Sequence, residues 1–341
     1  MTATTHNEPR PQGHVRVGLI ARGEPLAALA AAVDACVLLQ PLGQVGQPAA
    51  GLRDIPWFDD PRTLLGQPGI EAVVLGTSTR TDIELAALAA ERGLHVWRPP
   101  PVARSFPESA ELVDRVKRWN TIYRVASWWE FVVDHAWHEL PWPDGFVPRF
   151  SELSFSAAGP APNDWRALPS ETAGGVLATD SYDLLEALVA LRGLPTRVAA
   201  ALGRFRGAAR DTEDTAAAVL YYADGGCAVL RATWDAAPSE CVLRHHAATA
   251  TVTLTRDEVA LARPLGNSCD HRPLPGEFLT SELLRFAESV RSAARDRAAA
   301  PLERHLAVSA LLEALYLSAR TGDPESPGKF YQVQGRPEPR L

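Results

Sequence analysis

The sequence predicts an α/β protein with two parts, a doubly wound parallel sheet followed by an α/β domain with a large, open and mainly antiparallel sheet. Three observations lead to this class. Short apolar runs alternate with alanine-rich amphipathic segments over residues 14–126. From about residue 149, longer β-type runs joined by short turns take their place. The chain has 341 residues, of which 46% are hydrophobic and 22% charged, so it is long enough for two domains.

The first part, residues 14–126, alternates strands and helices at short intervals. We expect strands at residues 15–20, 36–39, 71–75, 95–97 and 122–126, and helices at 25–34, 61–65, 81–92 and 106–119. This alternation is typical of a parallel sheet covered by helices. Residues 1–13 contain no hydrophobic run, so we expect a disordered tail there and not a signal peptide.

The second part, residues 127–325, is dominated by β-type runs. We expect strands at 150–157, 197–206, 216–222, 227–234, 240–246 and 250–255, and helices at 180–191, 278–293 and 301–319. Short turns, such as the Ala-Asp-Gly-Gly sequence at 223–226, join neighbouring runs and favour antiparallel pairing. Residues 326–341 are expected to form a C-terminal tail.

Composition excludes several classes of function. The formal charge is −7 and the pI is about 5.8, whereas non-specific nucleic-acid binding requires a basic surface. No stretch reaches the roughly 18 apolar residues of a membrane span. Cys36, Cys227, Cys241 and Cys269 show no paired spacing, which favours reduced thiols in a cytoplasm. We therefore expect a cytoplasmic protein whose partner is a small molecule, and neither nucleic acid nor a membrane.

The histidines do not form a recognisable metal-binding motif. His135 and His138 lie one helical turn apart and are followed by Glu139, but this order differs from the His-Glu-x-x-His arrangement of zinc enzymes. His245 and His246 are neighbours on a predicted strand, so they point to opposite faces. We therefore expect no metal site.

Three segments resemble the Gfo/Idh/MocA family of oxidoreductases, typified by glucose–fructose oxidoreductase and inositol dehydrogenase. They are EAVVLGTSTRTDIELAALAAERGLHV at 71–96, DWRALPSETAGGVL at 164–177 and EDTAAAVLYYADGGCAVLRATW at 213–234. The resemblance covers residues 15–323. It implies a Rossmann domain followed by an α/β domain with a large open sheet, and a homodimer or tetramer formed through that sheet.

The family's dinucleotide-binding residues are altered in this chain. The family's GxGxxG turn corresponds to ARGEPL at 21–26, in which the second glycine, Gly23, is retained. Glu24 adds a negative charge beside the pyrophosphate position, and the acid that usually ends the second strand is replaced by Gln40. The resemblance thus assigns an NAD(P) cofactor, with binding expected to be weak or absent, to Arg22, Gly23, Gln40, Thr77 and Ser78.

The family's catalytic positions are also replaced. Its Glu-Lys-Pro motif, whose lysine contacts the substrate, corresponds to the prolines at 99–101, so Pro100 stands where the lysine would lie. Proline has no side-chain group that can carry a proton or a charge. The family's Asp and His, four residues apart after a double glycine, correspond to Thr179 and Asp183. A carboxylate can act as a general base, so we expect Asp183, with Tyr182 beside it, to be the catalytic group.

The same resemblance implies a cleft rich in tryptophan and polar residues. We expect its substrate pocket to contain Arg98, Trp128, Glu130, Trp165, Arg166 and Thr179. The segment SWWEFVVDHAWHE at 127–139 would then provide aromatic walls for a flat ligand. The alternative is that its tryptophans pack at the domain interface and its histidines lie on the surface.

Three functions remain open on the sequence alone. The altered motifs favour a repurposed enzyme, non-redox or with atypical redox chemistry, that acts on a small metabolite. The fold favours a first alternative, a conventional NAD(P)-dependent oxidoreductase acting on a sugar or cyclitol. A second alternative is a pseudoenzyme that regulates or scaffolds through its open sheet. Whether the protein binds a nicotinamide nucleotide would best separate these functions.

Overall fold

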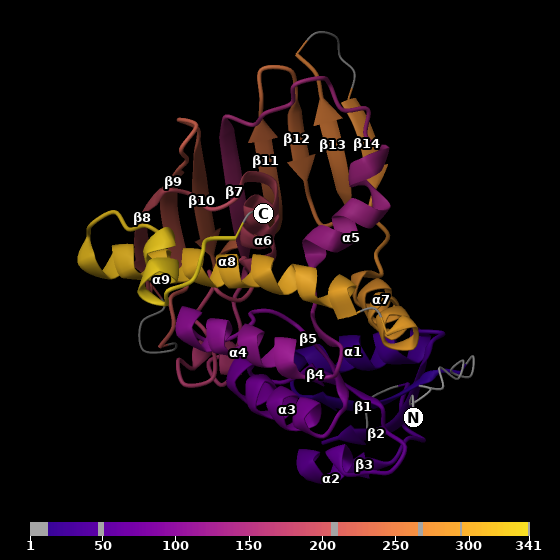
Figure 1. The fold of residues 1–341 in the computed structure, drawn as a ribbon. Helices are drawn as coiled ribbons and strands as arrows, with labels where there is room; N and C mark the ends of the chain where they lie inside the picture. The colour runs from indigo at the N-terminus through magenta and orange to yellow at the C-terminus, as the bar shows by residue number, and fades with distance from the viewer. Residues whose placement is uncertain (1–12, 47–50, 206–210, 265–268, 294, 340–341) are drawn as a thin grey trace, which may run out of the picture.

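The structure, a computed structural model, describes residues 13–46, 51–205, 211–264, 269–293 and 295–339. Two sheets form the two parts of the molecule, and the long helix α8 (Arg295–Thr321) runs between them (Figure 1). The first sheet is parallel and the second is mixed and open. This confirms the predicted α/β class and the order of its two parts.

The first sheet is parallel throughout, with the strand order β3-β2-β1-β4-β5-β6. Its strands are β1 (Val15–Ala21), β2 (Leu39–Val45), β3 (Trp57–Phe58), β4 (Ala72–Gly76), β5 (His95–Arg98) and β6 (Tyr123–Val125). Its helices are α1 (Glu24–Ala35), α2 (Pro61–Leu65), α3 (Thr79–Glu91) and α4 (Phe106–Arg118). Strands β1 to β3 follow one another towards one side of the sheet, and β4 to β6 follow towards the other, so the strand order reverses between β1 and β4. Ligands of open α/β sheets bind beside such a point, at the carboxyl ends of the strands, which form the carboxyl edge of the sheet.

Two glycines position helix α1 at this edge. A Cβ atom at Gly76, the last residue of β4, would lie 2.2 Å from Cδ1 of Leu29, so the close approach of α1 to β4 requires glycine. Gly23 precedes α1 with a φ of +70°, a conformation that favours glycine. The N-terminus of α1 therefore opens at the carboxyl edge of the sheet.

The described residues of the second part form an eight-stranded sheet with the order β14-β13-β12-β11-β7-β10-β9-β8. Its strands are β7 (Phe150–Ala158), β8 (Arg197–Gly203), β9 (Thr215–Tyr221), β10 (Cys227–Thr233), β11 (Asp235–His246), β12 (Thr251–Leu254), β13 (Glu258–Ala262) and β14 (Cys269–Pro273). Neighbours are antiparallel except β7 and β10, which are parallel. The helices are α5 (Trp128–His135), α6 (Tyr182–Arg192), α7 (Phe278–Ser292) and α9 (Gly328–Val333), with 3-10 helices at Trp137–Glu139 and Trp165–Ala167.

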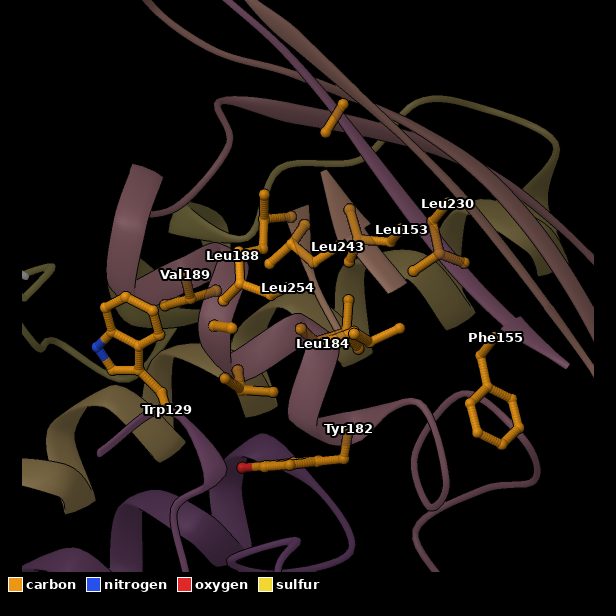
Figure 2. Close-up of a cluster of buried hydrophobic side chains, with 14 of the residues drawn as sticks. Trp129, Leu153, Phe155, Tyr182, Leu184, Leu188, Val189, Leu230, Leu243 and Leu254 are labelled. Atoms are coloured by element: carbon orange, nitrogen blue, oxygen red, sulfur yellow. The ribbon is translucent and has the colours of Figure 1, made fainter. Parts of the chain in front are cut away.

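Helix α6 packs against the second sheet and forms the centre of its core. Figure 2 shows Leu184 and Leu188 of α6 among leucines of the strands, including Leu153 and Leu243. All four side chains are buried. Leu184 and Leu188 are four residues apart and therefore lie on one face of the helix. This packing fixes the first turn of α6, which also carries Asp183.

The second strand begins later than predicted. Of the strand expected at 36–39, residues 36–38 are not extended into a strand, because Cys36 ends α1 and its carbonyl accepts a hydrogen bond from the Leu39 N–H in a turn. Strand β2 starts at Leu39 and continues through Pro41. A proline is tolerated there because the pairing of β1 with β2 shifts register directly after Pro41.

The predicted C-terminal tail at 326–341 contains a helix, α9, which corrects that expectation. Tyr331 of α9 is buried, and its ring centre lies 4.9 Å from that of Phe106 in α4. Aromatic packing thus holds this segment against the first part of the protein.

Most of the tail predicted at 1–13 and the last residue of the strand predicted at 197–206 lie outside the described residues. No described helix combines the length and hydrophobicity of a membrane span.

The face of the second sheet that points away from α6 is expected to bind a second copy of the chain. Along β9 and β10, the buried Leu220 and Leu230 alternate with Val219 and Val229, which are partly exposed and lie opposite each other. Apolar area on an open sheet favours association. Light scattering at micromolar concentration should give the mass of a dimer or tetramer, and Val229→Asp should reduce it to that of a monomer. A monomeric wild-type protein would contradict this expectation.

One buried histidine makes stability depend on pH. His245 of β11 is fully buried, and its Nδ1 lies 2.7 Å from the Ser151 hydroxyl. Burial, aided by the nearby Arg192, lowers the pKa of His245 to about 3. An unfolded histidine titrates near pH 6.5, so the stability due to neutral His245 is present above that pH and is lost as the pH falls. Between pH 7 and pH 5 the loss amounts to about 2 kcal/mol.

His245→Asn should remove this dependence, because asparagine does not titrate and can still bond Ser151. The free energy of unfolding, measured by urea denaturation at pH 7 and pH 5, should fall about 2 kcal/mol less in this variant than in the wild type. His138→Asn, at an exposed position, is the control and should behave as the wild type. Equal acid sensitivity of His245→Asn and the wild type would show that another group is responsible.

Candidate active site

A cleft of 460 Å³ lies between the two parts of the protein. One wall belongs to the carboxyl edge of the parallel sheet and contains Thr77, Trp97, Pro99 and Pro100. The opposite wall belongs to the second part and contains Phe155, Trp165, Arg166, Thr179, Asp183 and Arg256. Carboxyl edges of parallel strands are the usual place for ligand sites, so this cleft is the candidate active site.

Asp183 enters the cleft from the first turn of α6 and pairs with an arginine. Its Oδ2 lies 2.8 Å from Nη1 of Arg256, which comes from the turn between β12 and β13. The guanidinium carbon also lies 5.1 Å from the centre of the Trp128 ring. Although burial opposes the charged form, attraction by Asp183 raises the pKa of Arg256. A carboxylate and a guanidinium therefore stand side by side on the cleft wall.

A second group of charges lies beside this pair. Arg166 donates to Asp164 from Nε at 3.0 Å and from Nη2 at 3.2 Å, and its Nη1 lies 3.5 Å from Asp180. Asp180 also accepts a hydrogen bond from Trp234 Nε1 at 2.6 Å. Although burial acts against it, hydrogen bonding by Arg166 lowers the pKa of Asp164. These side chains hold one another in place next to Asp183.

The turn before α6 is held by a buried glutamate that lies just before β9. Glu213 accepts hydrogen bonds from the N–H groups of Gly175 and Leu177, at 2.7 and 3.2 Å, and from the Tyr316 hydroxyl at 2.8 Å. A Cβ atom at Gly175 would lie 1.8 Å from the Glu213 carbonyl oxygen, so this approach requires glycine. The double glycine and the Glu-Asp-Thr sequence thus position one side of the cleft.

Three of the predicted pocket residues line the cleft, namely Trp165, Arg166 and Thr179. The Thr179 hydroxyl donates a hydrogen bond to the Gly175 carbonyl at 2.8 Å, so the hydroxyl proton is engaged within the turn and is not directed at a ligand. Thr179 lies before α6 and not within a helix, because α6 begins at Tyr182. The predicted helix at 180–191 is otherwise correct.

The structure does not bring Tyr182 into the cleft, which corrects its expected catalytic role. Its side chain is fully buried, and its hydroxyl lies 3.0 Å from Nδ1 of His305 on α8. Successive helix residues point about 100° apart, so Tyr182 and Asp183 face different surroundings. Figure 2 shows Tyr182 at the edge of the α6 core.

Arg98 and Trp128 lie behind the cleft walls, which corrects two further pocket assignments. Arg98 is buried and donates to the carbonyl oxygens of Pro101 and Val102, at 2.8 and 2.9 Å, so it supports the proline segment from beneath. Trp128 is buried below the guanidinium of Arg256 and belongs to the core of the second part. For Trp128, packing is therefore the correct interpretation.

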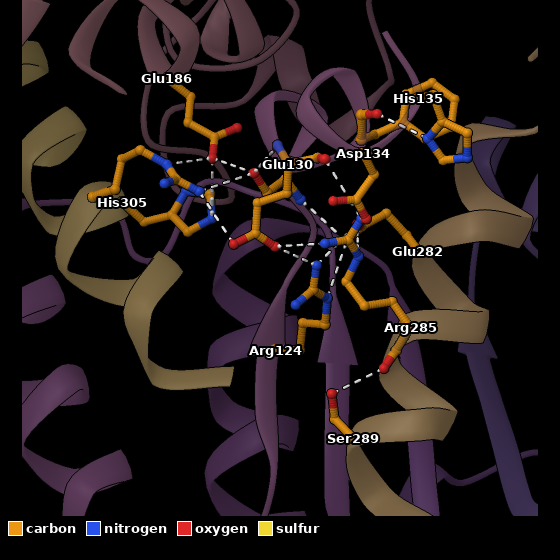
Figure 3. Close-up of polar contacts among 12 residues, drawn as sticks. Arg124, Glu130, Asp134, His135, Glu186, Glu282, Arg285, Ser289 and His305 are labelled. Carbon is orange, nitrogen blue, oxygen red and sulfur yellow. Dashed lines mark hydrogen bonds and ion pairs between the residues drawn. The ribbon is translucent and has the colours of Figure 1, made fainter. Parts of the chain in front are cut away.

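Glu130 belongs to a buried ionic network outside the cleft, shown in Figure 3, and not to the predicted pocket. It lies 2.7 Å from Arg124 of β6 and 3.5 Å from both Arg285 of α7 and Arg304 of α8. A fifth member, Glu186 of α6, is fully buried, and burial raises its pKa to about 7. The network joins the last strand of the first sheet to helices of the second part.

The predicted pair of histidines is also separated. His135 ends α5, whereas His138 lies in the following 3-10 helix, because Ala136 departs from helical geometry with a φ of −144°. Within the part of the chain that the structure describes, no group of three or more His, Cys, Asp or Glu side chains is placed to hold a metal ion.

Gln40 lies at the wrong end of the sheet for a cofactor contact, which corrects its assignment. It pairs with Arg16 near the start of β1, whereas the carboxyl edge is reached at Val45. The error follows from the strand wrongly predicted at 36–39. Gln40 consequently stands at the edge of the sheet opposite the cleft.

The other predicted cofactor residues lie at the carboxyl edge. Arg22 and Gly23 form the exposed turn before α1. The Thr77 hydroxyl donates to Asp82 at 2.6 Å, and Thr77 lines the cleft. The Ser78 hydroxyl caps α3 and donates to Glu171 of the second part at 2.7 Å. Both hydroxyls are therefore already engaged within the protein.

The start of α1 fits an anionic group such as a dinucleotide phosphate. Gly23 provides no capping side chain for the first N–H groups of α1, and a Cβ atom placed at Gly23 would have no atom within 4 Å. Pro25 removes one donor, and the Leu26 N–H donates to the Gly23 carbonyl at 3.2 Å. In the cleft, Nε1 of Trp97 is buried and has no partner among the described residues. The residues thus fit a nicotinamide dinucleotide, with fewer donors for its phosphates than the GxGxxG turn provides.

Fold and cleft together define an α/β protein in which a Rossmann-like parallel sheet faces a second domain with an open mixed sheet. Residues 148–257 match the GFO/IDH/MocA C-terminal domain. This match confirms the resemblance to the Gfo/Idh/MocA oxidoreductases seen in the sequence.

Two curated relatives match parts of the chain. The scyllo-inositol 2-dehydrogenase (NAD(+)) of Bacillus subtilis is 34% identical over 83 residues, which are 24% of this chain and 24% of that protein. The levoglucosan dehydrogenase of Pseudarthrobacter phenanthrenivorans is 28% identical over 207 residues, 52% of this chain and 53% of that protein. The chain thus spans about a quarter and about half of the length of these relatives.

Solved structures match the whole fold. A levoglucosan dehydrogenase in complex with NADH has a TM-score of 0.75 and 18% identity, with 92% of this chain and 99% of that chain covered. An oxidoreductase from Agrobacterium radiobacter in complex with NAD+, L-tartaric acid and magnesium has a TM-score of 0.73 and 15% identity, with 93% and 99% covered. At these identities the likeness establishes the fold alone.

The altered turn predicts weak nucleotide binding. The first and third glycines of the family turn are absent, and each lost phosphate contact costs about 1–3 kcal/mol, or about one to two decades in Kd. Titration calorimetry with NAD+, NADH and NADP+ should therefore give Kd values well above the micromolar range. A Kd of about one micromolar or tighter for any of these nucleotides would contradict the expectation.

Glu24→Gln tests the electrostatic part of this weakness. Glu24 is the first residue of α1 in sequence, and a negatively charged residue type at a helix N-terminus disfavours a phosphate bound there. Its neutralisation should tighten NAD+ binding by up to about tenfold. Glu84→Gln, on the exposed face of α3, is the control and should leave the Kd unchanged.

Proposed function

We propose that this protein is an oxidoreductase acting on a polyhydroxylated small molecule of the sugar or cyclitol kind. The position of Asp183 beside Arg256, in the cleft at the carboxyl edge of the Rossmann sheet, carries this proposal. The curated relatives are dehydrogenases of an inositol and of an anhydrosugar. They support redox chemistry more strongly than the non-redox function that the altered motifs favoured in the sequence.

The cleft offers surfaces and polar groups suited to a polyol. Phe155 and Trp165 line it with aromatic rings, against which the C–H face of a sugar ring can pack. Asp183 offers acceptor oxygens, and Arg256 offers N–H donors. Hydrogen bonds between hydroxyls and such charged groups are shorter and stronger than those between neutral groups.

Oxidation of a secondary alcohol releases a proton from the hydroxyl and a hydride from the carbon that bears it. Asp183 can accept the proton, because a carboxylate can serve as a general base. Pro100 lies on the opposite wall and has no group that could assist. A nicotinamide dinucleotide, when bound, supplies the hydride-accepting chemistry, and Arg22, Gly23 and Thr77 are the residues that would hold it.

Turnover of polyols in the presence of a nicotinamide nucleotide tests this function. The purified protein is incubated with NAD+ or NADP+ and a panel of inositols, anhydrosugars and aldoses that includes scyllo-inositol and levoglucosan. We expect reduction of the nucleotide, followed by absorbance, with at least one member of the panel. Absence of reduction by folded protein at millimolar nucleotide and polyol would refute the proposal.

One observation favours a second candidate, a non-redox reaction on the same class of substrate. The wall at Pro99 and Pro100 carries no cationic side chain, so the acid–base capacity of the cleft centres on Asp183. Where the substrate has a carbonyl group, as an aldose does, proton transfer at the adjacent carbon supports isomerisation or epimerisation without a hydride acceptor. The same panel, incubated in deuterium oxide without nucleotide, tests this by NMR. Deuterium incorporation would favour the second candidate, and its absence would oppose it.

A further inference from the structure

We infer that Arg256 is a positioning and specificity-determining residue, which orients the Asp183 carboxylate and, together with it, binds two adjacent oxygens of a vicinal diol. This inference rests on the proposed function and deepens it, because it names the group of the substrate that is recognised. The two side chains come from different elements, α6 and the turn between β12 and β13.

The turn that presents Arg256 is held by its own hydrogen bonds. The Thr255 hydroxyl accepts from the N–H groups of Asp257 and Glu258, at 3.2 and 3.1 Å. The Thr255 N–H donates to the Glu258 carbonyl at 2.9 Å. Because three hydrogen bonds fix this backbone, the side chain of Arg256 starts from a defined position at the end of the second sheet.

The guanidinium of Arg256 is fixed by its surroundings but keeps donors for a ligand. It stacks on the buried Trp128 ring at 5.1 Å and lies beside the Cys241 thiol. The Arg256 side chain is 40% exposed and lines the cleft. A guanidinium has five N–H donors, and Asp183 and Cys241 do not use all of them. The remaining donors can bind an oxygen of a ligand.

The ion pair engages one oxygen of the Asp183 carboxylate. Arg256 contacts Oδ2, and within the described residues Oδ1 has no hydrogen-bond partner. The Asp183 side chain is 18% exposed and lines the cleft. Oδ1 can therefore accept a hydrogen bond from one ligand hydroxyl while Arg256 donates to the neighbouring one. Adjacent hydroxyls on a sugar or cyclitol ring match this arrangement of acceptor and donor.

Arg256 also explains how the cleft obtains a cation without lysine. The sequence contains two lysines, Lys117 and Lys329, and both form exposed ion pairs, at 2.7 and 3.0 Å. Arg166, the other arginine that lines the described cleft, is held by Asp164 and Asp180. A positive charge that can meet a ligand is thus supplied from the second part of the protein.

Arg115 provides a matched control outside the cleft. It pairs with Glu91 at 2.8 Å and stacks on Trp119 at 5.3 Å, whereas Arg256 pairs at 2.8 Å and stacks at 5.1 Å. Arg256→Gln should lower kcat/KM for scyllo-inositol about 100-fold, with KM raised about tenfold. Arg256→Lys should recover part of this loss, because lysine keeps the charge but not the planar fork. Arg115→Gln should remain within about twofold of the wild type, because it lies far from the ligand.

A deoxy analogue separates diol recognition from a general effect on the fold. A cyclitol that lacks one of the two adjacent hydroxyls should react about tenfold less well with the wild type, and Arg256→Gln should discriminate much less between the two compounds. Thermal melting shows that each variant is folded. If the wild type turns over polyols and Arg256→Gln retains its kcat/KM and its discrimination, the inference is overturned while the proposed function stands.

A second readout applies if the wild type turns over no polyol, so that the proposed function fails. The Arg256 Nε–Hε signal in a ¹⁵N NMR spectrum is assigned by its absence in Arg256→Lys. Scyllo-inositol should shift this signal in the wild type and leave it unchanged in Asp183→Asn. No shift in the wild type up to the solubility limit of scyllo-inositol would overturn the inference.

Discussion

Asp183→Asn is expected to lower the turnover of the best polyol by about 100-fold or more, the contribution of general acid–base catalysis. Asparagine keeps the shape of the side chain, but it cannot take up the proton of a substrate hydroxyl. It also removes the negative charge that lies 2.8 Å from Arg256. Steady-state kinetics with the substrate found in the polyol panel measures this effect.

Asp114→Asn is the matched control for this substitution. Asp114 lies on α4, outside the cleft, and also forms an ion pair with an arginine, Arg336, at 2.6 Å. Its replacement should leave turnover unchanged. Near-normal turnover in Asp183→Asn, with a normal melting temperature, would make Asp183 a polar wall residue and remove the main support for the proposed function.

The first part of the fold could be predicted because its helix starts and buried strands can be identified from neighbouring residues in the sequence. Ser78 and Ser105 precede α3 and α4 and accept hydrogen bonds from N–H groups of the first turns. Strand β4, which precedes α3, is apolar and buried throughout, which identifies a parallel strand without reference to distant residues. The short apolar run at 36–39 misleads because the same residues serve as the end of a helix and a turn.

Strands β13 and β14 could not be predicted in the same way. Their pairing depends on β12 and on each other, so their stability comes from the assembled sheet and not from their own sequence. Helix α9 is similar, because Tyr331 becomes buried in a core that includes Phe106 of the first part. Elements of this kind resemble loops until the rest of the fold is present.

Residues of the cleft could be predicted only where a family motif fixes both the position of the residue in the fold and the direction in which its side chain points. Asp183, Trp165 and Arg166 follow from such motifs and do line the cleft. Tyr182 is adjacent to Asp183 in sequence, but its side chain points into the core. Arg256 lies in a polar turn that resembles any surface turn, and its role depends on the folding of that turn towards α6. No local pattern in the sequence distinguishes it from other arginines.

The largest effect on stability is expected in the buried ionic network of Figure 3. Arg124 of β6 and Glu282 of α7 lie 2.9 Å apart, and their side chains are 2% and 1% exposed. Glu282 also accepts a hydrogen bond from the Ser127 N–H at 3.2 Å. Burial raises the pKa of Glu282 even though Arg124 and Arg285 favour its charged form. This pair therefore joins the two parts of the protein under a large desolvation penalty.

Glu282→Gln is expected to lower the free energy of unfolding by about 3 kcal/mol, because it leaves the Arg124 guanidinium buried with less compensating charge. Glu130 still contacts Arg124 at 2.7 Å, which keeps the loss at the lower end for a broken buried pair. Urea denaturation measures the change. Glu303→Gln breaks the exposed pair with Lys117, at 2.7 Å, and should cost less than about 1 kcal/mol. Equal losses in the two variants would show that the buried network contributes no more than a surface ion pair.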